Sequence, residues 1–456
     1  MSSFRIKSSC FLLASLMCFS FIGSGCRHKG NEFPVIEYPE DIKTEPVSEE
    51  TSASEDDHAG VSNIIVASPY SQNTIQYLSK LYYCKTHDLM DENNGSTIEL
   101  EYLDGFDPDF IVDSILTSGD GASVDNIISW NEDGNAPDIF LTGRVDEMRR
   151  QGLVEPLNDY ISENALYSSG KIYVNALRQV TNNGSVYGVP FYSSVVLIAG
   201  NADFIPSTGK LSFKNTTEQF YEYLQTIASE AACIPLSSGY DAVPYINSAF
   251  TDAPCSFMMR DEYKRDKASA LEVIGTTLEY VNRLYREGLS SNVTSDGTNP
   301  VFGRQAACWV TRSSDISGWI SYYPNKLYLL DLPSSADSSE ATPMASLYSF
   351  CINSGSSSKE FAADFASFMA LDPDARMLIE RLEHQTGFLP SIKNAEVWNY
   401  ITSDEVFGAA ALNYSQSLEN AVYCPPLNDS LYISVTEYFA AYDGGVFDPE
   451  ACYGQP

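Results

Sequence analysis

The side chains that commonly do chemistry form no catalytic motif in this sequence of 456 residues. Only four histidines occur, His28, His58, His87 and His384, and the motifs HExxH, GxSxG, GxGxxG and the P-loop are absent. These absences exclude most zinc, serine-nucleophile and nucleotide chemistries. A glycosidase needs only two carboxylates, which the 51 acidic residues from Val61 onward could supply, so this enzyme class stays an alternative.

Aromatic and planar polar side chains stand at the ends of expected strands and in one loop. A sugar is held when its C–H faces stack on aromatic rings and its hydroxyls bond planar polar groups. The residues of these types that could contact a solute are Tyr70, Arg144, Asp146 and, in the loop SSGYDAVPYI, Tyr240, Asp241 and Tyr245. The alternatives are packing at a helix start for Tyr70 and an ion pair within a helix for Arg144 and Asp146.

Strands and helices alternate along the part of the chain that must position these residues. Apolar or alternating runs predict strands over 61–67, 97–103, 137–141, 194–198, 328–332 and 348–352. Apolar residues at helical spacing predict helices over 72–83, 108–116, 145–151, 268–287 and 359–371. This alternation indicates an α/β fold with doubly wound parallel sheets, in which ligands bind at the carboxyl ends of the strands. Residues 68–70 and 142–144 would then lie beside one cleft.

The net charge is −34, from 27 basic and 61 acidic residues. Because binding to nucleic acid requires clustered Lys and Arg, nucleic acid is excluded as a partner. The seven cysteines after Cys26 show no CxxC pair and no nearby His at zinc-site spacing, so no obligatory metal is expected.

The N-terminus is typical of a secretory signal peptide, over residues 1–25. Arg5 and Lys7 precede the apolar run CFLLASLMCFSFI, which is too short to span a membrane and is followed by small residues and Cys26. This arrangement resembles the lipobox of bacterial lipoproteins, which predicts lipidation at Cys26. Residues 26–60 are acidic and poor in large apolar residues, so we expect a disordered tether.

Several blocks of the sequence resemble a known family. They are PDIFLTGRVDEMRRQGLVEPLNDYI, VYGVPFYSSVVLIAGNADF, FGRQAACWV, SSKEFAADFASFMALDPDAR and HQTGFLPSIK. Together, and in this order, they are similar to blocks of the extracellular solute-binding proteins of ABC importers, the family that includes maltose-binding and oligosaccharide-binding lipoproteins.

This resemblance implies a periplasmic-binding-protein-like fold of two α/β lobes, each with a doubly wound sheet, joined by hinge strands. Block matching places the first lobe at 61–190 and 312–345 and the second at 195–307 and 347–456, with hinge segments at 190–195, 310–312 and 346–348. It also implies ligand contacts by Tyr192 in the crossing segment, Trp319 and Tyr432.

We therefore predict a monomeric extracytoplasmic receptor, anchored to the cell membrane by lipid at Cys26. It would capture a carbohydrate, an oligosaccharide, between its lobes and deliver it to the permease subunits of an ABC transporter. No catalysis and no cofactor are expected. A polyamine or another small solute is the alternative that the acidic composition suggests.

Overall fold

The structure is a computed structural model that describes residues 63–90, 99–119, 121–237, 280, 283–291, 299–333, 343–383 and 386–423. These residues all lie in one compact unit, Gly60–Pro456. Among them, no helix is long and apolar enough to cross a membrane. The described side chains also include no group of His, Cys, Asp and Glu that could hold a metal ion. The predicted signal, the tether, Cys26, Tyr240, Asp241, Tyr245 and Tyr432 lie outside the described residues.

The described strands are β1 (Asn63–Ser68), β2 (Ile111–Leu116), β3 (Ile139–Thr142), β4 (Thr181–Asn182), β5 (Ser185–Val186), β6 (Val189–Asn201), β7 (Ile234–Ser237), β8 (Ala306–Arg312), β9 (Leu327–Leu330), β10 (Met344–Ile352), β11 (Leu389–Pro390) and β12 (Val422–Tyr423). The described helices are α2 (Gln72–Thr86), α3 (Leu100–Leu103), α4 (Val124–Glu132), α5 (Val145–Arg150), α6 (Asn158–Ile161), α7 (Ala165–Ser168), α8 (Val174–Gln179), η1 (Ala202–Phe204), α9 (Thr217–Glu230), η3 (Ser313–Asp315), α13 (Ile316–Tyr322), α14 (Lys359–Leu371), α15 (Pro373–Glu383), α16 (Ala395–Thr402), α17 (Gly408–Ser417) and η4 (Leu418–Asn420).

The expected strand and helix at the start of the folded part are confirmed as β1 and α2. The Ser71 side chain caps α2 by accepting a hydrogen bond from the Thr74 backbone N–H, 3.2 Å away. Ile75, Leu78 and Leu81 recur at helical spacing and are fully buried, which fixes the face of α2 that packs on the sheet. The expected elements at 137–141, 145–151 and 359–371 are likewise confirmed as β3, α5 and α14.

Two neighbouring expectations were wrong. Residues 97–103 were expected to form a strand, but the described part of this segment contains the short helix α3. Residues 108–116 were expected to form a helix, but they contain strand β2. β2 pairs in parallel with β1 over six residues, from Asn63 opposite Ile111 to Ser68 opposite Leu116. This long-range pairing decides the local conformation, because strand propensity depends mainly on what a strand packs against.

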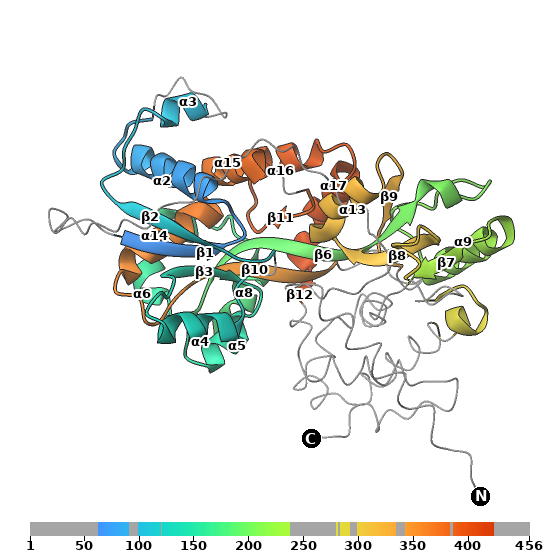
Figure 1. The fold of residues 1–456 in the computed structure, drawn as a ribbon, viewed down its shortest axis with the longest axis horizontal. Helices are drawn as coiled ribbons and strands as arrows, with labels where there is room; N and C mark the ends of the chain where they lie inside the picture. The colour runs from blue at the N-terminus through green and yellow to red at the C-terminus, as the bar shows by residue number, and fades with distance from the viewer. Residues whose placement is uncertain are drawn as a thin grey trace, which may run out of the picture. The chain divides into compact units, whose positions relative to one another are not determined.

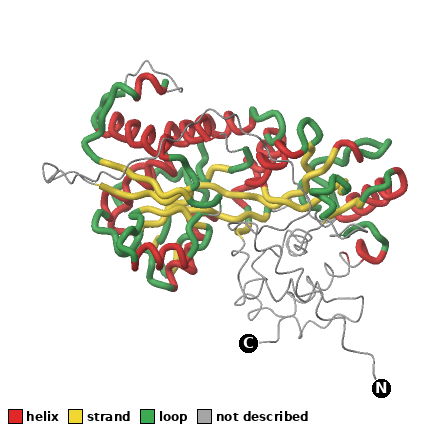
Figure 2. Tube along the Cα trace, viewed as in Figure 1, coloured by secondary structure: helices red, strands yellow, loops and turns green. Residues whose placement is uncertain are grey.

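The sheet is mixed, with strand order β2-β1-β3-β10-β6-β8-β7. β1, β2 and β3 are parallel, as are β7 and β8, whereas β10 runs antiparallel to β3 and β6, and β6 runs antiparallel to β8. Figure 1 shows α2, α15 and α16 on one face of the β1–β2–β3 part and α4, α5 and α6 on the other, which is the arrangement of a doubly wound sheet. In Figure 2 the strands form a band that continues from this part into β8 and β7.

Two large hydrophobic cores lie along this sheet, together with a small cluster of Ala199, Val301, Ala306, Trp309 and Tyr323. The first core includes buried residues of β1, α2, β3, β10 and α14 to α17, and the second includes those of α9, β7, β8 and β9. Three segments pass between them. β6 places Val195 in the first core and Val196 in the second, β10 places Ala345 in the first and Met344 in the second, and β8 continues through η3 to Ile316 in the first. This agrees with the predicted fold of two α/β parts joined by strands.

The predicted lobe boundaries stay a prediction, and the packing favours a different division of the later segments. Residues 347–456 were assigned to the second lobe, but the buried residues from Leu347 to Tyr423 that contribute to these cores pack in the first, apart from partly buried Val422. Residues 312–345 were assigned to the first lobe, but Tyr328 and Leu330 pack in the second core. The reason is that β10 pairs with β3 and thereby returns the chain to the first core.

Candidate functional site

The carboxyl ends of the three parallel strands meet in one place. The Thr117 backbone N–H donates to the Ser68 carbonyl oxygen at 2.9 Å, and the Ala122 N–H donates to the Leu141 carbonyl at 2.7 Å. The Thr142 hydroxyl donates to the Ala122 carbonyl at 3.0 Å. We call residues 68–71, 117–119 and 142–144 the strand-end edge. Ligands of doubly wound sheets bind at such an edge. β1 and β3 are parallel neighbours, so residues 68–70 and 142–144 follow adjacent strand ends, and the cleft beside them stays a prediction.

The strand-end edge is joined to two of the segments that pass between the cores. Tyr192 of β6 donates a hydrogen bond from its hydroxyl to the Gly119 carbonyl at 3.0 Å. Its ring stacks on that of Tyr348, the residue opposite it on β10, with centroids 4.7 Å apart. The Tyr348 ring in turn lies against Gly143, where an added Cβ would be 3.3 Å from it. A shift of β6 or β10 would therefore also move residues of the strand-end edge.

Two of the predicted solute contacts are buried beneath this edge. Tyr70 is 0% exposed, and its ring packs edge-on against Phe191 with centroids 5.9 Å apart. Burial holds the pKa of the Tyr70 hydroxyl well above its ordinary value. Tyr192 is also 0% exposed. In this structure both side chains are buried in the first core, and direct contact with a solute stays a prediction.

Arg144 and Asp146 lie close in sequence but in different surroundings. Arg144 begins α5 at the strand-end edge with a side chain 35% exposed, and its guanidinium is 3.9 Å from Glu147. Asp146 forms ion pairs with Arg149 at 2.7 Å and with Arg150 at 3.1 Å, all on α5. Arg144 can therefore offer donors to a solute at the edge, whereas the Asp146 carboxylate already has partners within its helix.

Trp319 belongs to an aromatic cluster that packs against the first core and against a small cluster formed by Ala199, Val301, Ala306, Trp309 and Tyr323. It lies on α13, and its indole N–H donates to the Thr311 hydroxyl of β8 at 2.8 Å. Its ring centroid is 5.2 Å from that of Trp309 and 5.7 Å from that of Phe302. The structure thus brings Tyr70, Arg144 and Tyr192 together and places Trp319 in a separate group.

Sequence reasoning missed the loop after β2. Leu116, at the end of β2, is 71% exposed, and Thr117 to Gly119 complete the strand-end edge. The wrong helix prediction for 108–116 hid this loop. A simple signal was present in the sequence, since the β-branched segment Ile111–Leu116 ends at the polar stretch Thr117-Ser118-Gly119.

Two pairs of adjacent serines at the crossing segments were also missed. The Ser194 hydroxyl of β6 donates to the Ser314 hydroxyl at 2.9 Å and accepts from the Ser314 N–H at 3.1 Å. The Ser313 hydroxyl accepts from the Val195 N–H at 3.0 Å. The available signal was two pairs of adjacent serines, Ser193-Ser194 within the apolar strand β6 and Ser313-Ser314 directly after β8, in η3. Their bonds hold two crossing segments side by side.

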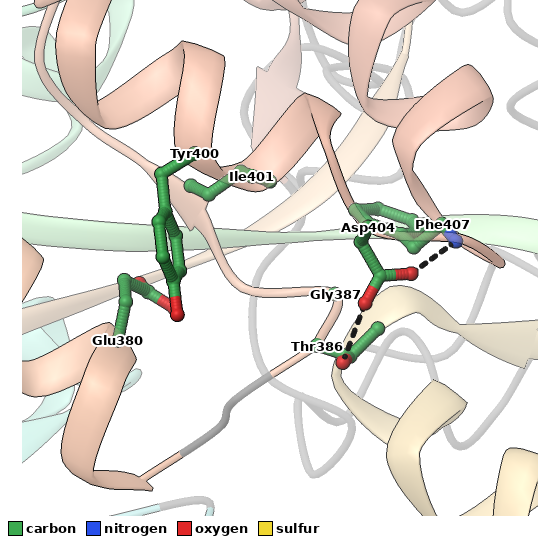
Figure 3. A pocket seen from close by; sticks show the side chains of 7 residues that line it. All are labelled: Glu380, Thr386, Gly387, Tyr400, Ile401, Asp404 and Phe407. Carbon is green, nitrogen blue, oxygen red and sulfur yellow. Dashed lines mark hydrogen bonds between the residues drawn. The ribbon is translucent and has the colours of Figure 1, made fainter.

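A pocket of about 100 Å³ lies close to Ser313, the residue that follows β8. Its lining residues are Glu380, Thr386, Gly387, Tyr400, Ile401, Asp404 and Phe407. Figure 3 shows Glu380 of α15 and the Tyr400 hydroxyl of α16 pointing toward each other, while Asp404 accepts hydrogen bonds from the Thr386 hydroxyl and the Phe407 N–H. The Asp404 carboxylate is already hydrogen-bonded. The other acidic group in the pocket lining is the buried carboxyl of Glu380.

The loop that closes the pocket rests on a crossing segment. Gly387 has a φ of +97°, and a Cβ added to it would lie 1.8 Å from the Ser313 carbonyl oxygen. The Ser317 hydroxyl donates to the Thr386 carbonyl at 3.2 Å. This loop of the first core therefore packs directly on the chain that arrives from β8.

Glu380 should make the free energy of unfolding rise as the pH falls from about 8 to about 5. Burial raises the pKa of its carboxyl from 4.5 to about 7, against the opposing charge of Arg376. Above pH 7 the buried Glu380 carboxylate is charged, and this lowers the free energy of unfolding. As the pH falls from the folded pKa of about 7 toward the ordinary value of 4.5, the carboxyl takes up a proton and this destabilisation disappears. Asp331, whose pKa burial raises to about 6, contributes with the same sign.

Urea unfolding at pH 8 and pH 5.5 tests this expectation. Glu380→Gln should reduce the difference between the two pH values by on the order of 2 kcal/mol. Glu222→Gln, at an exposed position of α9, should leave it unchanged. An equal pH dependence in wild type and Glu380→Gln would contradict the assignment.

Known proteins share this architecture. The profile of the family described as bacterial extracellular solute-binding protein matches residues 112–375. No curated protein matches the chain. Among solved structures, the sugar-binding protein MalE from Xanthomonas citri has a TM-score of 0.65 at 12% identity, with 86% of this chain and 95% of that chain covered.

Two further solved structures share the fold. The cyclic alpha-maltosyl-1,6-maltose binding protein from Arthrobacter globiformis has a TM-score of 0.60 at 16% identity, covering 87% of this chain and 94% of that chain. An ABC substrate-binding protein from Listeria monocytogenes in complex with cycloalternan has a TM-score of 0.59 at 14% identity, with the same coverage. The profile match spans more than half of the sequence, and these likenesses agree with two cores joined by crossing strands. The chain therefore belongs to the bacterial extracellular solute-binding protein family.

Proposed function

We propose that this chain is a receptor that captures an oligosaccharide between its two cores and delivers it to an ABC importer. The observation that carries the proposal is the strand-end edge, which is hydrogen-bonded through Tyr192 to a strand shared by both cores. Family membership supports capture of a solute outside the cell. The ligands named for the structural neighbours, maltotetraose, cycloalternan and a cyclic maltosyl-maltose, support a saccharide as the solute.

Capture would work by shifting a population of open and closed forms. A solute that contacts both cores binds the closed form more tightly and thereby favours it. The crossing segments β6, β10 and β8–η3 are where such a motion would bend the chain. Arg144, Ser118 and the exposed side chain of Leu116 would meet the solute from the first core.

Membrane attachment is part of the proposal. The apolar run before Cys26, the small residues next to it and the acidic tether support cleavage and acylation at Cys26. A lipid anchor would keep the receptor beside its permease at the outer face of the membrane, without a protein span.

A cationic solute such as a polyamine is the second candidate. Residues 86–143, which supply much of the strand-end edge, contain fourteen acidic residues and no lysine or arginine. This excess of acidic residues would favour a cationic solute.

A thermal-shift screen of the purified protein against mono- and oligosaccharides, amino acids and polyamines separates these candidates. A ligand at 100 times its Kd stabilises the native state by about 2.7 kcal/mol, which raises Tm by on the order of 5 °C. We expect oligosaccharides to give this shift. Arg144→Ala should reduce it, whereas Arg150→Ala, with a side chain 62% exposed on the same helix, should not. A shift with polyamines alone would overturn the saccharide proposal.

A further inference from the structure

A carboxylate from a distant part of the chain is bound to the strand-end edge. Glu383 is the last residue of α15, which lies on the same face of the sheet as α2 in Figure 1. Its Oε1 accepts hydrogen bonds from the Ser71 backbone N–H at 3.1 Å and from the Ser71 hydroxyl at 3.2 Å. The Thr74 hydroxyl donates to the same oxygen at 2.5 Å. These bonds hold Glu383 beside Ser71 although 312 residues separate them in sequence.

The place that this carboxylate occupies is one where an anion would otherwise bind. The N-terminal end of a helix attracts negative charge, because N–H groups point outward there and the helix dipole is positive. α2 is 15 residues long and begins directly after Ser71. Glu383 takes up the Ser71 N–H and the hydroxyls of Ser71 and Thr74. It therefore fills the position that a carboxylate or phosphate group of a solute would take.

Helix capping alone does not account for this arrangement. The Ser71 side chain already caps α2 by accepting a hydrogen bond from the Thr74 N–H at 3.2 Å. Glu383 adds a second acceptor, and that acceptor carries a charge. The donors to its Oε1 are neutral groups, so they hold the carboxylate without cancelling its charge.

The surrounding charges act in the same direction. Within residues 68–71, 117–119 and 142–144, Arg144 is the one charged residue, and its guanidinium lies 3.9 Å from Glu147. Residues 86–143 contain fourteen acidic residues and no lysine or arginine. An anionic group placed near Ser71 would therefore meet like charge and would find the local donors already occupied, and both effects oppose its binding.

We propose that Glu383 is a specificity-determining residue, which excludes acidic solutes from the capture site by occupying the anion position beside Ser71. This proposal rests on the proposed function, because it takes the strand-end edge to be part of the capture site. It narrows the class of solute. Uncharged oligosaccharides are accepted, whereas those that carry a uronate, aldonate or phosphate group at this edge are rejected.

Glu383→Gln tests the proposal, because it removes the charge and keeps an oxygen for the same donors. Isothermal titration calorimetry of the purified protein would compare neutral malto- and xylo-oligosaccharides with the same oligosaccharides oxidised to a carboxylate at either end. We expect the wild type to bind the neutral forms more tightly. Glu383→Gln should reduce this preference by about tenfold for a carboxylate at one of the two ends. The preference is a ratio of affinities, so a smaller folded fraction would not change it.

Glu132→Gln is the matched control. Glu132 is an exposed residue at the end of α4, which leads away from the strand-end edge to the start of β3. This change alters the net charge by the same amount as Glu383→Gln and should leave the preference unchanged. Equal preference in the wild type and Glu383→Gln, or equally tight binding of neutral and acidic forms by the wild type, would overturn the proposal.

Chemical rescue tests the anion position without a saccharide. Glu383→Ala removes the acceptor from the Ser71 N–H and from two hydroxyls, so it should lower Tm. Acetate at ten times its Kd should then raise the Tm of this variant by about 2 °C, and the neutral analogue acetamide should not. The wild type should show no such difference. Equal effects of acetate and acetamide on Glu383→Ala would mean that no anion position exists there, and the proposal would fail.

The outcomes separate the two proposals. If neutral oligosaccharides bind but Glu383→Gln keeps the full preference, Glu383 serves only to hold α2, and the capture function stands. If no saccharide binds to the wild type, the proposed function fails and the specificity proposal fails with it.

Discussion

Replacing Gly387 with alanine should lower the free energy of unfolding by about 3 to 5 kcal/mol, among the largest effects expected for one added methyl group. The new Cβ would lie 1.8 Å from the Ser313 carbonyl oxygen, closer than any real contact, and backbone must move to relieve it. Because Ser313 belongs to the segment that passes from β8 into the first core, we also expect weaker binding of the solute.

Gly209→Ala is a close control for this change. Gly209 has a φ of +93°, nearly that of Gly387, but an added Cβ there meets nothing within 4 Å. It should therefore show the backbone penalty alone, about 1 to 2 kcal/mol. Urea unfolding of both variants measures the difference. Equal losses would mean that the contact with Ser313 is unimportant.

Arg376→Ala should cost about 3 to 5 kcal/mol, because it leaves Glu380 as an unpaired buried carboxyl. The Arg376 side chain is 1% exposed and its guanidinium lies 3.0 Å from Glu380. The guanidinium also lies 4.1 Å from the centroid of the Phe191 ring, on the strand that both cores share. Loss of the cation therefore removes an ion pair and a contact beneath the strand-end edge together.

Two further variants serve as controls for Arg376→Ala. Lys326→Ala breaks an ion pair with Asp203 whose side chains are about half exposed, and it should cost less than about 1 kcal/mol. The double change Arg376→Met with Glu380→Leu should recover most of the stability lost in Arg376→Ala, since paired apolar groups can replace a buried ion pair. Chemical denaturation at pH 7 provides the values. A loss below about 1 kcal/mol for Arg376→Ala would refute the role assigned to the pair.

Local patterns predicted the elements whose neighbours lie close in sequence. Four elements have both their apolar periodicity and their boundary residues within a short stretch of sequence: β1, α2, β3 and α14. Each was found within a few residues of its expected place. The segment from 108 to 116 was misassigned because its strand conformation depends on pairing with β1, some fifty residues earlier in the chain. A window of ten residues does not contain that information.

The sequence predicted which strand ends form the candidate site, but it did not predict which side chains there are exposed to solvent. The rule that ligands meet the carboxyl ends of parallel strands correctly brought together residues 68–70 and 142–144. Whether a tyrosine at such an end faces the solvent or the core depends on its neighbours in space. Phe191 and Arg376 enclose the region of Tyr70, and Arg376 comes from α15, some three hundred residues away in the sequence. Nothing near Tyr70 in the sequence indicates this enclosure.

The long strand β6 has a consequence for how such a receptor can diversify. All thirteen of its residues are buried, so none of its positions is open to substitution by a solvent-facing side chain. A change in the strand would disturb the packing of one core or the other, because Val195 and Leu197 pack in the first core and Val196 and Ile198 in the second. New solute preferences must therefore evolve in the loops at strand ends, where sequence variation costs little stability, while the shared strand is inherited with few changes.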